Sequence, residues 1–131
     1  MQQRIDQEIA LLKTRFPDLE FRPDGRWVRI PEYPLPSGWS VSSTQLAFPI
    51  PVEYPSGPPY GIYVPSGMRF GGKAPNDYND KAPAQPPFGG AWGIFSWTTH
   101  DGAWHATADI TKGSNLLNWV LGFGRRFEEG I

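Results

Sequence analysis

Apolar side chains near the N-terminus recur at helical spacing. They follow one another at intervals of four, three and four positions: Ile5, Ile9, Leu12 and Phe16. Such a stripe is typical of an amphipathic helix, and Pro17 ends it because residues before a proline avoid the helical conformation. We therefore expect a helix over residues 2–15. Polar residues that fall largely outside the stripe are Arg4, Gln7, Glu8 and Lys13.

The pattern then changes to short apolar segments that are typical of strands. They comprise residues 19–21, 27–30, 45–50, 60–64 and 92–98. The intervening residues 31–43 are rich in proline and are expected to form a loop. Residues 65–90 are dominated by Gly, Pro, Asn and Asp, and predict a long irregular surface loop. Loops of this length are usually functional or disordered, so this one is either a lid over a cleft or an inserted segment.

A second helix is expected near the C-terminus, over residues 113–127. Its apolar residues share one broad face: Leu116, Leu117, Val120, Leu121 and Phe127. Gly122 and Gly124 weaken this helix by roughly 1 kcal/mol each relative to alanine. Strands that follow one another and a segregated helix predict an α+β fold, an antiparallel meander sheet flanked by an N-terminal and a C-terminal helix. Without a repeat or a boundary, residues 1–131 are interpreted as a single domain.

Composition narrows the possible functions. The chain of 131 residues has a net charge of −1, which argues against nucleic acid as the main partner because phosphate binding needs surplus Lys and Arg. It has no cysteine and two histidines, so thiol chemistry is excluded and neither a metal nor another cofactor is expected. The polar N-terminus is unlike a signal peptide, and no apolar run is long enough to cross a membrane. We expect a soluble cytoplasmic protein.

Two motifs occur in a definite order along the chain. The first is Tyr54-Pro55 followed by Pro58-Pro59, a pair of stiff proline turns before the segment 61–64. The second is the triplet Phe95-Ser96-Trp97, which lies eight residues before Trp104. Together with a helix at each end, this ordered set resembles the ubiquitin-conjugating-enzyme superfamily. In that family a cysteine occupies the centre of the triplet, and residues 29–38 further resemble a divergent bacterial branch of it.

The resemblance implies a UBC-like fold and a role in a bacterial protein-conjugation pathway. The implied partners are a ubiquitin-like protein and its activating enzyme, and no membrane. In the family the polar face of the first helix meets the activating enzyme, which assigns this contact to Arg4, Glu8 and Lys13. The chain departs from the family where a His-Pro-Asn motif is expected, because Pro87-Phe88-Gly89 stands there.

Ser96 stands at the position of the family's nucleophile. We expect it to accept the ubiquitin-like protein as an oxyester, although a serine hydroxyl needs a base to take its proton. His100, four residues on, is the candidate base, and Asp101 is its candidate orienting group. Two alternatives remain open. Ser96 is inert and the domain is a catalytically silent binding module, or the chain is a Pro/Trp-rich interaction domain unrelated to ubiquitin.

Overall fold

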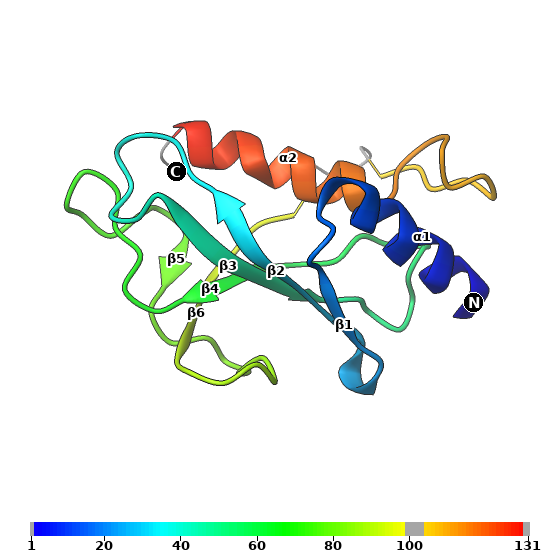
Figure 1. The fold of residues 1–131 in the computed structure, drawn as a ribbon, viewed down its shortest axis with the longest axis horizontal. Helices are drawn as coiled ribbons and strands as arrows, with labels where there is room; N and C mark the ends of the chain where they lie inside the picture. Colours follow the sequence, from blue (N-terminus) through cyan, green and yellow to red (C-terminus); the bar gives the residue numbers. More distant parts are fainter. Residues whose placement is uncertain (1, 99–103, 130–131) are drawn as a thin grey trace.

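The computed structural model describes residues 2–98 and 104–129. Two helices enclose six strands along the chain (Figure 1). In order, the elements are α1 (Gln2–Arg15), β1 (Glu20–Arg22), a short 3-10 turn (Asp24–Arg26), β2 (Trp27–Pro34), β3 (Ser43–Pro49), β4 (Ile62–Pro65), β5 (Tyr78–Asn79), β6 (Trp92–Phe95) and α2 (Leu116–Glu129).

The six strands form one sheet in the order β1-β2-β3-β4-β6-β5, and every neighbouring pair is antiparallel. The first four strands therefore form a meander, as the sequence predicts. β5 departs from it because it pairs along the outer side of β6, with Tyr78 opposite Phe95, so that β4 and β6 become neighbours. The expected α+β class, with an antiparallel sheet and one helix at each end of the chain, is confirmed.

Both helices lie along one side of the sheet (Figure 1), and the main core fills the space between the helices and the sheet. The expected stripe of α1 is part of this core, since Ile5 and Leu12 are fully buried. From α2, the rings of Phe123 and Phe127 pack edge to face with centroids 4.7 Å apart. Large aromatic side chains supply much of the buried apolar surface. The removal of this surface from water is the main force that holds helices and sheet together.

A smaller cluster covers the opposite face of the sheet. It consists of Ala47, Tyr63, Trp92 and Ile94, with Trp27, Ala82 and Phe88 packed against it. Phe88 comes from the long loop, and the guanidinium groups of Arg22 and Arg29 lie 5.2 Å and 5.6 Å from its ring centroid. Cations at this distance from an aromatic face are attracted to it. The later part of the loop therefore covers the sheet on the side away from the helices, whereas Met68 from its earlier part is buried in the main core.

The structure departs from the sequence prediction most clearly at β2, at β5 and at the start of α2. β2 continues to Pro34 because a register shift between Ile30 and Tyr33 lets the strand pass its prolines, which lack an N–H to donate. β5 was not expected, since its two residues are surrounded by loop-forming ones. α2 begins three residues later than predicted because Gly113 has a φ of 75° and Asn115 caps the helix. The Asn115 side chain accepts a 2.8 Å hydrogen bond from the Asn118 N–H.

Candidate functional site

Ser96 directly follows β6 and is exposed to solvent. Its N–H donates a 2.8 Å hydrogen bond to the carbonyl of Asp77, which continues the pairing of β6 with β5. Its two neighbours are anchored in the main core. Phe95 is 1% exposed, and the Trp97 ring lies 5.4 Å from that of Trp119 and packs against α2. The serine is thus presented to solvent from a fixed backbone.

The segment that carries Ser96 is tied to the proline turns. The Thr98 hydroxyl donates a 2.8 Å hydrogen bond to the carbonyl of Pro59, and the Gly61 N–H donates one of the same length to the carbonyl of Trp97. A little further on, the Trp104 indole N–H bonds the carbonyl of Pro55 at 2.8 Å. The two motifs that the sequence singled out therefore lie side by side, as expected from their order.

The candidate base cannot be placed beside Ser96. His100 and Asp101 lie outside the described residues. Within the described ranges, 2–98 and 104–129, the Ser96 hydroxyl makes no hydrogen bond. Asp77, whose carbonyl accepts the Ser96 N–H, has its side-chain carboxylate 3.9 Å from the Arg126 guanidinium. The observed link between this ion pair and Ser96 is therefore the backbone hydrogen bond to Asp77.

The residues at the position of the family's His-Pro-Asn motif have a packing role. Phe88 lies in the cluster beneath the sheet, against Trp92, with ring centroids 6.4 Å apart. The nearby Gln85 is also engaged, because its side-chain oxygen accepts a 3.0 Å hydrogen bond from the Trp92 N–H. This stretch is therefore occupied in holding the loop to the far face of the sheet.

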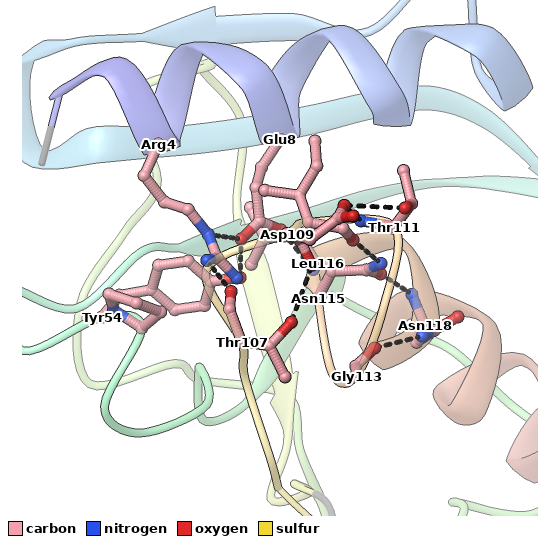
Figure 2. A network of polar contacts seen from close by, with 12 residues as sticks. Arg4, Glu8, Tyr54, Thr107, Asp109, Thr111, Gly113, Asn115, Leu116 and Asn118 are labelled. Atoms are coloured by element: carbon pink, nitrogen blue, oxygen red, sulfur yellow. Dashed lines mark hydrogen bonds and ion pairs between the residues drawn. The ribbon is translucent and has the colours of Figure 1, made fainter.

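A buried carboxylate connects the proline turns to both helices. Glu8 is 1% exposed, and its oxygens accept hydrogen bonds from Arg4 Nε at 2.8 Å, the Tyr54 hydroxyl at 2.5 Å and the Leu116 N–H at 2.7 Å. Figure 2 shows these groups converging where α1 meets the start of α2. Burial, and after it the bond to Glu8, raise the pKa of Tyr54 above its ordinary value. A buried charge needs such partners because water cannot solvate it.

This network corrects the assignment of Arg4 and Glu8 to an exposed docking face. The Arg4 side chain is 13% exposed and also donates to the carbonyl of Thr107, so both residues act inside the protein. Lys13 is exposed, as expected. The sequence did carry a signal for Glu8: it lies three residues after Ile5 and four before Leu12, which places it on the buried stripe.

Within the part of the chain that the structure covers, no group of three or more His, Asp or Glu side chains could hold a metal ion. No helix there is both long enough and apolar enough to cross a membrane. The chain matches no protein-family model, no curated protein and no solved structure.

Proposed function

We propose that this chain is a divergent UBC-like domain that accepts a ubiquitin-like protein from an activating enzyme as an oxyester on Ser96. The observation that carries the proposal is the contact between the serine segment and the proline turns, made by Thr98 with Pro59 and by Gly61 with Trp97. The order of these motifs is the basis of the resemblance to the superfamily. Their contact gives that order a physical meaning, because stiff turns hold an exposed serine in place.

The proposed reaction is an acyl transfer. The Ser96 oxygen attacks the activated C-terminal carbonyl of the ubiquitin-like protein, and a C–O bond forms as the bond to the activating enzyme's leaving group breaks. The hydroxyl proton passes to His100, four residues on, with Asp101 as its orienting group. A base in this role contributes about 10²–10⁴-fold in rate. Ser96 then carries the ubiquitin-like protein as an ester until a later acceptor receives that protein.

The activating enzyme needs a docking surface, and the exposed side of α1 is the candidate. Lys13 is exposed there. The pathway would be a bacterial protein-conjugation system in the cytoplasm, and neither nucleic acid nor a membrane would take part in it.

A second function deserves a test because of the environment of Ser96. In the described part of the chain its hydroxyl has no hydrogen-bonding partner, and Phe88 fills the position of the family's transfer motif with a packing residue. Both observations favour a catalytically silent module, which would position the ubiquitin-like protein or the activating enzyme without forming a bond.

A charging experiment separates the two functions. The protein is incubated with ATP, a bacterial activating enzyme and its ubiquitin-like protein, chosen first from genes next to its own, and an adduct is sought by mass spectrometry. The enzyme model predicts an adduct that is lost in Ser96→Ala and kept in Ser37→Ala, a second exposed serine. Binding of the partners without any adduct would support the silent module. If neither partner bound nor reacted, both functions would be wrong.

A further inference from the structure

A groove of about 430 Å³ lies where the ends of α1 and β2 meet the C-terminal half of α2, and none of the residues of the proline turns lines it. α1 contributes its last residue, Arg15, to the lining, and Phe16 follows directly after it. β2 contributes Tyr33. From α2 the lining includes Gly124, Arg125, Phe127 and Glu128. Volumes of this size are within the range of small-molecule sites in proteins, which are mostly apolar with a few placed polar groups.

The floor of the groove is aromatic. The Tyr33 ring lies between those of Phe16 and Phe127, with centroid distances of 5.8 Å and 5.6 Å. Phe127 is 1% exposed and belongs to the main core, so the floor of the groove is continuous with that core. Such a surface suits a flat apolar group.

Two unpaired cations stand at the rim. Arg15 and Arg125 are exposed, and neither has a carboxylate within 4.0 Å in the described part of the chain. Glu128 also lines the groove, so its own residues leave a net positive charge of one. Asp18 and Glu32 line a smaller hollow that shares Arg15 with the groove, and in the described part of the chain neither forms an ion pair with it.

The Tyr33 hydroxyl adds a donor to this groove. Tyr33 is 8% exposed, and its hydroxyl has no hydrogen-bonding partner among residues 2–98 and 104–129. It reaches the groove because residue 124 is glycine: a Cβ there would lie 2.3 Å from the hydroxyl oxygen. Burial raises the pKa of Tyr33, so the group stays protonated and can donate at neutral pH.

We propose that this groove binds a small molecule that carries a carboxylate on an aromatic or similarly bulky apolar body. The body lies against Phe16 and the exposed part of Tyr33, with Phe127 behind them. The carboxylate lies between Arg15 and Arg125, since planar guanidinium groups form strong charge-assisted pairs with carboxylates, and the Tyr33 hydroxyl donates to it. The site is separate from Ser96 and independent of the function proposed above.

The first test compares charged and neutral ligands of the same shape. 4-Biphenylacetate, 4-biphenylacetamide and acetate are titrated into the whole protein, and binding is followed by the amide NMR signals of Leu35 and Gly124. The proposal predicts that biphenylacetate shifts these signals and that the amide binds about tenfold more weakly, the loss expected for one charge-assisted hydrogen bond. Acetate should not bind, because it lacks the apolar body.

Variants then identify the groups involved. Arg15→Gln and Arg125→Gln should each weaken biphenylacetate about tenfold, and Tyr33→Phe should weaken it severalfold. Lys13→Gln, an exposed cation of α1 outside the groove, is the matched control and should bind as the natural protein does. Circular dichroism of each variant verifies that it is folded.

Three results would overturn the proposal. Equal binding of the acid and the amide would mean that the groove does not recognise a carboxylate. If the arginine variants folded and bound biphenylacetate normally, Arg15 and Arg125 would not be part of the site. A peptide such as acetyl-Gly-Gly-Phe with a free carboxylate, if it bound tenfold more tightly than biphenylacetate, would reassign the groove to a protein C-terminus.

Discussion

The hydroxyl of Tyr54 donates a 2.5 Å hydrogen bond to Oε2 of Glu8, although the two residues are 46 positions apart in the sequence. The other oxygen of Glu8 accepts the N–H of Leu116 at the start of α2. Tyr54 immediately precedes the proline turns that contact the Ser96 segment. One carboxylate therefore fixes the first helix, the last helix and the turns relative to one another.

The first prediction concerns the stability that Glu8 supplies. The carboxylate of Glu8 accepts three hydrogen bonds, and in Glu8→Gln an NH₂ group replaces one of its two oxygens, so at least one of these bonds is lost. Arg4 also loses its buried counter-charge. We expect the free energy of unfolding to fall by about 3 kcal/mol or more, as for other broken buried pairs. Urea unfolding followed by tryptophan fluorescence measures it.

Glu32→Gln is the matched control, because Glu32 is exposed and forms no ion pair in the described part of the chain. It should change stability by no more than about 0.5 kcal/mol. Equal effects of the two substitutions would mean that the network around Glu8 does not stabilise the fold.

The second prediction uses the two glycines of α2. A Cβ at Gly122 would lie 3.6 Å from the Trp97 ring, an ordinary contact, whereas one at Gly124 would lie 2.3 Å from the Tyr33 hydroxyl. Gly122→Ala should therefore raise the melting temperature, since alanine favours a helix by about 1 kcal/mol over glycine. Gly124→Ala should lower it, because overpacking costs about 1–3 kcal/mol.

The double variant Gly124→Ala with Tyr33→Phe checks the cause. Without the hydroxyl, the closest ring atom lies 3.5 Å from the new Cβ, so the double variant should recover the stability that Gly124→Ala loses. If the two effects were simply additive, the clash would not be the reason for the glycine.

The third prediction concerns pH and the long loop. The Asp80 carboxylate pairs with Arg69 at 2.9 Å and accepts the Gly67 N–H at 2.9 Å. These bonds, that with Arg69 foremost, hold the pKa of Asp80 well below its ordinary 3.8. A lowered pKa means that the contact contributes stability above pH 3.8 and loses it only as the pH falls further, through the folded-state pKa.

The Gly67 amide proton reports this titration in NMR spectra. Its signal should move with a midpoint clearly below 3.8, and the acid-induced movement should vanish in Asp80→Asn. Asp24→Asn, an exposed aspartate elsewhere, should leave it unchanged. A midpoint at or above 3.8 would show that Asp80 does not anchor the loop.

The spacing of apolar residues predicted most of the fold, because a helix or strand with one buried face has a regular pattern of apolar residues in the sequence. The helix over residues 2–15 and the strand positions of the meander follow from it. It failed at Tyr78-Asn79, where two residues form an edge strand only because β6 offers them a partner. No local pattern encodes a pairing that tertiary structure creates.

Polar residues inside the protein were harder to predict than apolar ones. Glu8 was assigned to the polar side of the first helix because glutamate is usually exposed, yet its position in the stripe is that of a core residue. Its partners Tyr54 and Leu116 lie 46 and 108 residues away, so no local pattern could reveal them. The contact of Thr98 with Pro59 was predictable only as a consequence of the motif order.

The fourth prediction concerns the base in the proposed reaction. If His100 takes the proton of Ser96, His100→Ala should slow adduct formation by about 10²–10⁴-fold. His105→Ala is the control, because His105 is exposed in the segment before α2. Similar rates for both variants in a quenched time course would assign the proton transfer to another group.

The chemistry of the bond itself tests the account most directly. Because the chain has no cysteine, no acyl adduct on it can be a thioester. An adduct on the Ser96 hydroxyl is an ester, which survives thiol reductants and is cleaved by hydroxylamine. Ser96→Cys should instead yield an adduct that reductants cleave. The account predicts this exchange of sensitivity, measured by mass spectrometry of the adduct before and after each reagent. An adduct of unchanged sensitivity in Ser96→Cys, or one that persists in Ser96→Ala, would contradict it.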